Sequence, residues 1–171
     1  MVKAGLTGEN RTAKMKIVKA AEKHIPEIIE LWKELTDFLK DIDPDALWSR
    51  SKNGHTNWEK LLRGVMGSEN ALVLVALYKG HVVGYSISEI SRYPPIYERE
   101  IYGFIDDMAV RSDYRRKGIG EQMLGRILQW FESRNIDRIE LTVAAKNQLG
   151  YSFWKKHGFK DYMRRLYLDR G

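Results

Sequence analysis

The sequence predicts an α/β fold, with a mixed β-sheet covered by helices on both faces. Strand-like runs alternate with helix-like runs along the chain, which is the pattern of layered α/β proteins. Two early strand-like runs, 71–78 and 82–90, lie on either side of Lys79-Gly80 and predict an antiparallel hairpin. The chain has 171 residues, no internal repeat and no linker, so we expect a single domain over residues 15–171.

Before the hairpin, the sequence predicts one strand and two helices. Residues 15–20 alternate as a strand does. A long amphipathic helix follows, entered through Pro26 in its first turn and ending near Asp43-Pro44. Its apolar positions recur at helical spacing: Ile25, Ile28, Ile29, Trp32, Leu35, Leu39 and Ile42. A shorter helix is indicated by Trp58, Leu61, Leu62 and Val65.

After the hairpin, the sequence predicts a stiff loop and then further strands and helices. Loop 92–100 contains Pro94-Pro95, which favours an extended conformation. A strand ending at Val110 precedes a helix whose apolar face is formed by Met123, Leu124, Ile127, Leu128 and Phe131. The remaining expected elements are a strand within 136–143, a helix from Asn147 and a last strand over Tyr162–Leu168.

The composition excludes several classes of site. Cysteine is absent, which rules out disulfides, thiolate metal sites and a cysteine nucleophile. The four histidines are scattered without ligand spacing, so neither a metal site nor a Ser-His-Asp triad is expected. The net charge is +6, but the basic residues are spread along the chain and mixed with 23 acids, which disfavours a nucleic-acid partner.

The amino-terminal residues carry no targeting pattern. Residues 1–14 contain no apolar run, so we interpret them as a flexible extension or the product of a misplaced start, and we expect them to contribute nothing to the core. No stretch of the chain approaches the ~18 apolar residues of a membrane-spanning helix. These observations predict a cytoplasmic protein without a membrane partner.

The segment Arg115-Arg116-Lys117-Gly118-Ile119-Gly120 joins the strand that ends at Val110 to the next helix. A glycine-rich loop at a helix start exposes free backbone N–H groups, and the helix dipole adds about half a positive charge there. The three cations strengthen that field, so the segment predicts a seat for phosphate or pyrophosphate, although a plain tight loop with solvated charges stays open. No nucleoside-triphosphate P-loop occurs, and Gly118-Ile119-Gly120 lacks the third glycine of the dinucleotide fingerprint.

Two motifs carry a family resemblance. Strand, Arg-x-x-Gly-x-Gly and amphipathic helix together resemble the acyl-CoA-binding motif of the GNAT N-acetyltransferase superfamily. The stretch from Asn147 to Phe159, with Phe153-Trp154 and Gly158-Phe159, is similar to that family's late helix. The resemblance covers Met15 to Leu168 and implies a GNAT-like sheet whose central parallel strands, Ile101–Val110 and Ile136–Val143, splay apart to admit acyl-CoA.

The resemblance also implies where acetyl-CoA, the acyl donor, would bind. Pantetheine would lie against the backbone of Met108, Ala109 and Val110. Pyrophosphate would lie on the loop and helix start formed by Arg115, Arg116, Lys117, Gly118, Ile119, Gly120 and Glu121. Gly118 and Gly120 would permit close approach and unusual dihedral angles. Asn147 would cap its helix, contact the cofactor, or do both. The resemblance also implies that Trp154 is a cofactor-binding residue.

Catalysis is where the sequence departs from the family pattern. Trp154 stands where many members carry a tyrosine that is proposed to protonate the departing thiolate, and an indole N–H is no proton-transfer acid near neutrality. Tyr151, three residues earlier on the same helical face, could substitute or could simply pack. Asp107 matches the family position where an acidic residue, or the water bound to it, often receives the amine proton. Adjacent Asp106 is open as a solvated or capping carboxylate, because successive strand side chains point to opposite faces.

The sequence therefore predicts an N-acetyltransferase that moves an acetyl group from acetyl-CoA to a primary amine by direct attack. A catalytically silent acyl-CoA-binding regulatory module is the alternative that Trp154 keeps open. The acceptor amine belongs to a small molecule or a protein, and an acidic, aromatic rim of Tyr93, Tyr97, Glu98 and Glu100 would suit a cationic one. No metal is expected, and a homodimer is left open.

Overall fold

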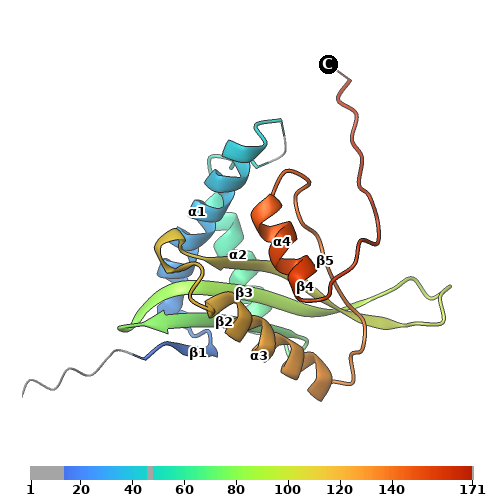
Figure 1. Ribbon diagram of the computed structural model, residues 1–171, viewed down its shortest axis with the longest axis horizontal. Helices are drawn as coiled ribbons and strands as arrows, with labels where there is room; N and C mark the ends of the chain where they lie inside the picture. Colours follow the sequence, from blue (N-terminus) through green and yellow to red (C-terminus); the bar gives the residue numbers. More distant parts are fainter. Residues whose placement is uncertain (1–13, 46–47, 171) are drawn as a thin grey trace, which may run out of the picture.

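The computed structural model describes residues 14–45 and 48–170 (Figure 1). Along the chain, its elements are β1 (Lys16–Lys19), η1 (Glu22–His24), α1 (Ile25–Ile42), α2 (Gly54–Met66), β2 (Ala71–Tyr78), β3 (His81–Arg92), β4 (Ile101–Val110), η2 (Ser112–Tyr114), α3 (Ile119–Ser133), β5 (Ile139–Leu141) and α4 (Gln148–Lys156). The predicted alternation of strands and helices is confirmed. The bounds expected for α1, β2 and β4 are also those of the structure.

The sheet has five strands in the order β1-β2-β3-β4-β5. The first four strands pair antiparallel, and β4 pairs parallel with β5, so the sheet is mixed as predicted. The turn between β2 and β3 has positive φ at both central residues, 52° at Lys79 and 86° at Gly80. Positive φ at both positions is the geometry of the tight hairpin turn that matches strand twist.

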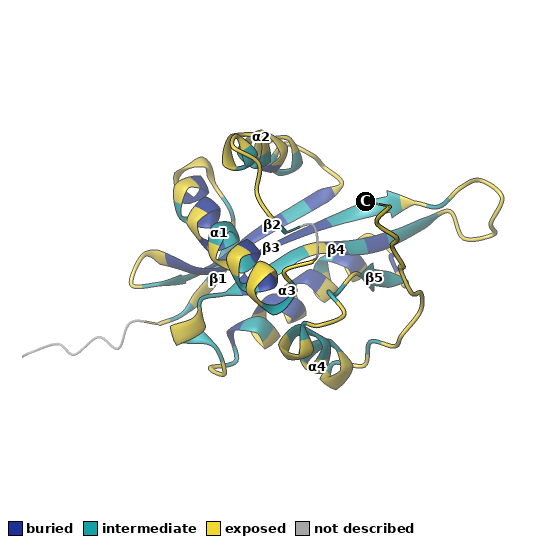
Figure 2. Cartoon of the chain, turned by 90° about the horizontal axis from the view of Figure 1, so that it is seen from above, coloured by how far each residue is buried: buried dark blue, intermediate teal, exposed yellow. Residues whose placement is uncertain are grey.

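Helices cover both faces of the sheet (Figure 1, Figure 2). On one face, α1 and α2 pack over a cluster that includes Ile28, Leu62, Val75 and fully buried Tyr85. On the other face, α3 and α4 pack over a cluster centred on Ile127 and Phe131. The mixed sheet with helices on both faces is therefore confirmed, and the two parallel strands lie at the end of the sheet opposite β1.

Two predictions about the last part of the chain need correction. The strand expected within 136–143 is shorter, because β5 has only three residues. The strand expected over Tyr162–Leu168 is wrong: residues 160–170 form no regular element, and their side chains are exposed. Their strand-like composition has no partner strand within the described residues, and a strand is stable only when its backbone is paired.

Some predictions concern residues that the structure does not describe. Of the expected extension 1–14, only Lys14 lies inside the described residues. Among residues 14–45 and 48–170, no helix is long and apolar enough to cross a membrane. The same residues contain no group of three or more acidic or histidine side chains arranged to hold a metal ion.

Candidate active site

The loop between η2 and α3 has the backbone conformation that its glycine predicts. Gly118, the residue that caps α3, has φ of 76° and ψ of 6°, in the left-handed region that favours glycine. Arg116 also has positive φ, at 59°. Two left-handed residues so close together curl the loop, so that it meets the helix start as a tight turn.

The N–H groups at this turn are free. Within the described residues, no hydrogen bond uses the backbone N–H of any residue from Arg116 to Glu121. No side chain caps α3 at Gly118 either. A helix of fifteen residues therefore presents its dipole and its unpaired donors to whatever lies before it. These donors fit an anionic pyrophosphate without any side-chain contact.

The cations of the loop are used partly to hold it in place. The Arg115 Nε donates to the Val110 carbonyl at 3.0 Å, and its guanidinium lies 5.4 Å from the centre of the Phe38 ring. The Lys117 ammonium lies 5.0 Å from the Tyr114 ring centre. Arg115 thus ties the loop to the end of β4 and to α1. Its charge still contributes to the local field.

Helix α4 packs against the first turn of α3, next to the loop. A Cβ placed on Gly120 would come within 3.2 Å of the Phe153 ring, so glycine allows α3 and α4 to approach closely. Glu121 accepts a hydrogen bond of 3.0 Å from Lys156, and this bond is the main reason that its pKa is lowered. The side-chain oxygen of Asn147 accepts from the Gly150 N–H at 2.9 Å, which confirms its predicted cap of α4.

Strand β4 has an open edge next to this loop. It pairs with β5 only at Gly103, Phe104 and Ile105, and β5 then ends at Leu141. On its other side, β4 stays paired with β3 up to Val110. The backbone of Met108, Ala109 and Val110 therefore has no strand on the β5 side within the described residues. This splayed geometry matches the place where pantetheine is expected to bind.

A β-bulge changes how the two adjacent aspartates lie. Ile87 pairs with Asp107, and the next residue, Ser88, pairs with Ile105, so Asp106 is an extra residue without an opposite partner. Ile105 packs in the α3 layer, whereas Asp107 bonds to Tyr85 in the α1 and α2 layer. The strict alternation assumed from the sequence fails at this point. Asp106 is instead close enough to both Asp107 and Glu89 for their charges to raise its pKa.

The two aspartates have different surroundings. Asp107 is half-buried and accepts a 3.2 Å hydrogen bond from the Tyr85 hydroxyl; burial raises its pKa, and this bond opposes the rise. Asp106 reaches solvent, yet the protein packed around it raises its pKa to about 7, with smaller contributions from Glu89 and Asp107. A carboxyl group that titrates near neutrality suits proton transfer. No local pattern in the sequence marks the bulge that places Asp106 beside Asp107.

Aromatic side chains gather at the start of β4 and in the loop that precedes it. Tyr93 stacks on Tyr102 with ring centres 4.3 Å apart, and Tyr102 lies edge-on to Phe104 at 6.3 Å. The Tyr93 hydroxyl donates to Glu140 of β5. Tyr97, Glu98 and Glu100 are exposed in the loop that projects beyond these strands (Figure 2). This part of the sheet is therefore acidic and aromatic.

The aromatic residues of α4 contact residues other than Asp106 and Asp107. Trp154 packs against Phe153 and Phe159 in the α3 layer, with ring centres 5.0 and 5.2 Å apart. The Tyr151 hydroxyl donates to Asp161 at 3.2 Å. Its role as a relocated acid for the departing thiolate stays a prediction.

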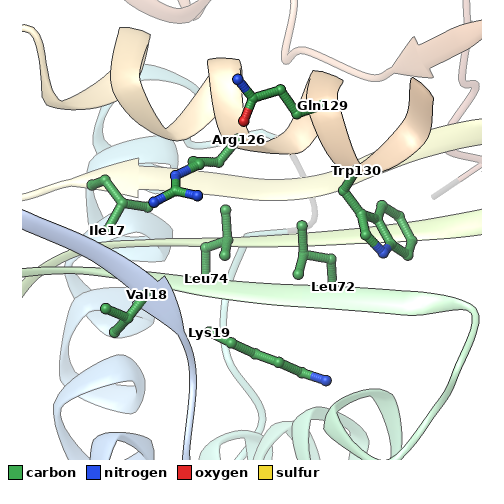
Figure 3. A pocket seen from close by; sticks show the side chains of 8 residues that line it. All are labelled: Ile17, Val18, Lys19, Leu72, Leu74, Arg126, Gln129 and Trp130. Atoms are coloured by element: carbon green, nitrogen blue, oxygen red, sulfur yellow. The ribbon is translucent and has the colours of Figure 1, made fainter. Parts of the chain in front are cut away.

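A hollow of about 450 Å³ lies elsewhere, between edge strand β1 and helix α3 (Figure 3). It is lined by Ile17, Val18, Lys19, Leu72, Leu74, Arg126, Gln129 and Trp130. None of the predicted site residues lines it, and β1 is the strand farthest from β5 in the sheet order. The candidate active site is therefore the region around β4, the loop before α3 and the bulge.

Comparison with known proteins identifies the class. The acetyltransferase (GNAT) family matches residues 28–159, which is most of the chain. The chain belongs to this family.

Individual relatives are more distant. The chain is 33% identical over 58 residues to streptothricin acetyltransferase A of Bacillus subtilis (strain 168), and the match spans 34% of each protein. The crystal structure of a mutant of the BH1408 protein from Bacillus halodurans has a TM-score of 0.81 at 21% identity, covering 90% of this chain and 98% of that one. The aminoglycoside N-acetyltransferase AAC(6')-Iy in complex with CoA has a TM-score of 0.70 at 14% identity, covering 94% and 97%. At these identities, the structural likeness shows the fold.

Proposed function

We propose that this GNAT-family protein transfers the acetyl group of acetyl-CoA to a primary amine of a small cationic acceptor. One observation carries the proposal. Between Asp106 and Gly120, the chain places a carboxyl pair, an unpaired strand edge and a turn of free N–H groups one after another. Strand residues rise about 3.3 Å each, so this order matches an extended thioester whose anionic end lies at the helix start.

The donor would be held by backbone groups. The N–H groups from Arg116 to Glu121 would bind the pyrophosphate, and the open edge of β4 would pair with the pantetheine amides. A donor on the same edge would polarise the thioester carbonyl in the transition state. Holding the amine in contact with this carbonyl removes much of the entropic cost of a bimolecular reaction, which is worth several kcal/mol.

Asp106, the extra residue of the bulge, would act as the general base. The attacking nitrogen must be neutral, and a lysine-like ammonium with a pKa of ~10.4 costs about 4–5 kcal/mol to deprotonate at pH 7. Asp106, open to solvent, would receive that proton, while Asp107 stays bonded to Tyr85. Attack of the neutral amine on the thioester carbonyl forms the N–C bond and gives a tetrahedral adduct. The adduct nitrogen loses its second proton to water, and collapse of the adduct re-forms the carbonyl and breaks the C–S bond. The CoA thiolate then takes a proton from water.

The rim of the site favours a cationic acceptor. Asp106 and Glu89 lie near each other, and two nearby carboxylates are stabilised by a cation between them. Tyr102 and Phe104 offer aromatic faces beside them. The named relatives act on streptothricin and on aminoglycosides, which supports a small molecule with several amino groups.

A silent acyl-CoA-binding module is the second candidate, and one observation favours it. Trp154 packs inside the α3 layer, and the Tyr151 hydroxyl is bonded to Asp161, so α4 offers no free phenol to protonate the thiolate. Transfer without such an acid requires the thiolate to leave unassisted or through water.

Thiol release with a panel of amines tests the proposal. Acetyl-CoA is incubated with aminoglycosides, streptothricin, polyamines and lysine peptides, and free CoA and acetylated product are both measured. We expect matched release of CoA and formation of product with at least one cationic small amine. Tight binding of acetyl-CoA without product for any amine would support the silent module instead.

A further inference from the structure

Tyr85 of β3 is a buried residue whose hydroxyl reaches the carboxyl pair of β4. Its side chain is 0% exposed and belongs to the cluster between the sheet and helices α1 and α2. A buried phenol is stable only when its O–H group has an acceptor. Within the described residues, that acceptor is the Asp107 carboxylate, at 3.2 Å. Tyr85 therefore links the core under the two helices to the candidate active site.

The strand register explains how the hydroxyl reaches this carboxylate. Tyr85 lies opposite Ala109, and Asp107 is two residues before Ala109 along β4. Diagonal neighbours of this kind on adjacent strands lie about 7–8 Å apart, a span that a tyrosine side chain can cover. The bulge at Asp106 comes directly before Asp107. The hydroxyl of Tyr85 thus anchors the bulge at its Asp107 end.

Aromatic packing keeps the Tyr85 ring in this orientation. Trp58 of α2 lies edge-on to it, with ring centres 6.0 Å apart and ring planes at 78°. Trp58 stacks in turn on Trp32 of α1, with ring centres 4.8 Å apart. Because protein cores are close-packed, a ring enclosed in this way cannot swing its hydroxyl aside without opening the core. The hydrogen-bond donor is therefore in place before any substrate binds.

The hydrogen bond makes the two adjacent carboxyl groups unequal. A donated hydrogen bond favours the charged form of a carboxyl group. The Tyr85 bond accordingly lowers the pKa of Asp107, against the rise that burial causes. Within the described residues Asp106 receives no hydrogen bond, and burial, Glu89 and Asp107 together raise its pKa to about 7. Near neutrality, Asp107 is thus the fixed carboxylate of the pair, and Asp106 gains and loses a proton.

The other groups around the pair do not produce this difference. On β3, the titratable neighbours are Tyr85 and Glu89. Helices α1 and α2 contribute aromatic and aliphatic side chains, Trp32 and Trp58 among them. Within the described residues, no lysine or arginine acts on either aspartate. Among these residues, it is the Tyr85 hydroxyl that stabilises the charge of Asp107.

We propose that Tyr85 is a positioning residue for the transfer: it holds Asp107 as the fixed carboxylate of the bulge and thereby leaves Asp106 to take the proton of the acceptor ammonium. This inference rests on the proposed function, because it concerns the base of that same reaction. Tyr85 is fully buried, so it acts through Asp107 and not on the substrates. The proton that Asp106 receives passes on to water, which restores the pair after each turnover.

Carbon-13 NMR titration of the aspartate carboxyl groups tests the proposal, with Asp106→Asn and Asp107→Asn proteins to assign the two signals. In the wild type, Asp107 should titrate at a lower pH than Asp106. Tyr85→Phe keeps the ring and removes only the hydroxyl. It should move the Asp107 midpoint to higher pH and the Asp106 midpoint about 1 pH unit lower, because a neutral Asp107 no longer opposes ionisation of Asp106. Tyr78→Phe, at a ring that packs on Tyr114, is the matched control and should change neither midpoint.

Either of two titration results would overturn the proposal. One is a wild type in which Asp107 titrates at a higher pH than Asp106, a result that needs no variant to fold. The other is a Tyr85→Phe protein in which both midpoints move toward the ordinary aspartate value of about 3.9. That pattern would mean that the hydroxyl only keeps water out of the core.

A double variant tests whether Tyr85 acts through Asp107. In an Asp107→Asn background, Tyr85→Phe should leave the Asp106 midpoint unchanged, and a further change there would contradict the proposal. With an accepted amine, the pH–rate inflection of Tyr85→Phe should also move to lower pH, at an unchanged KM for acetyl-CoA. The titrations need neither donor nor acceptor. Failure of the amine panel and failure of this proposal are therefore separate results.

Discussion

The donor side and the acceptor side of the candidate site are built from different chemical groups. The donor side consists of backbone: the free N–H groups before α3 and the open edge of β4. The acceptor side consists of side chains: Asp106, Asp107 and the aromatic rings around them. A backbone site tolerates most substitutions but not a change of its glycines. A side-chain site responds to single-atom changes.

The largest effect is expected at Asp106. Replacing it by Asn removes the group that receives the amine proton, and loss of a general base typically slows turnover by about 100-fold or more. With a pKa of about 7, Asp106 is mostly a carboxylate above pH 7 and mostly protonated below it. The wild-type rate should therefore rise as the pH increases through about 7. The variant should lose that rise, as measured by pH–rate profiles. Asp113→Asn, an exposed acid in η2, should behave as wild type.

Asp107→Asn should have a smaller effect of about tenfold, because Asn still bonds to Tyr85 while the charge is lost. The Asp107 charge helps to raise the pKa of Asp106, so its removal should lower that pKa. The inflection of the pH–rate profile should therefore move to lower pH. An inflection that moves to higher pH would make Asp107 itself the base.

Stability should respond in the opposite direction to activity. The folded-state pKa of Asp106 lies above its unfolded value, so the charged form is disfavoured by folding, and stability falls as pH rises from about 4 through about 7. Asp106→Asn should therefore raise the melting temperature at pH 8, by about 2 °C after allowing for solvent screening. Little change is expected at pH 4. Calorimetry at both pH values measures the two melting temperatures. An equal increase at pH 4 and pH 8, or a decrease at pH 8, would contradict the prediction.

The smallest effect is expected at Tyr151. Its hydroxyl is bonded to Asp161 in the irregular segment 160–170, so Tyr151→Phe should change turnover by less than about twofold. Steady-state kinetics at saturating donor measure this directly. A hundredfold loss with unchanged CoA affinity would make Tyr151 the missing acid.

Local patterns predict the glycine turn of the donor side, and several turns and helix starts elsewhere in the chain. The Pro26 start of α1, the Lys79-Gly80 turn and the glycine at φ of 76° before α3 all follow from near neighbours in the sequence. The Asn147 cap of α4 is predictable for the same local reason. Backbone geometry of this kind depends on residues within a few positions of each other.

The acceptor side depends on pairing between distant segments, which local patterns do not encode. The bulge at Asp106 arises from the register of β3 against β4, more than fifteen residues away. On the donor side, the short β5 that leaves the β4 edge open also depends on strand pairing, and so does the unpaired 162–168 segment. Register is a property of the assembled sheet, so the sequence identifies the two aspartates but not how they lie.

The most direct test of the central claim is calorimetric titration of CoA into wild type, Gly118→Val and Gly125→Val. Gly118 needs its positive φ to present the N–H groups, whereas a Cβ on Gly125 in α3 meets no other atom. We predict at least tenfold weaker binding for Gly118→Val and wild-type binding for Gly125→Val, with both variants folded. Equal CoA affinity for all three proteins would contradict the claim that this turn holds the donor.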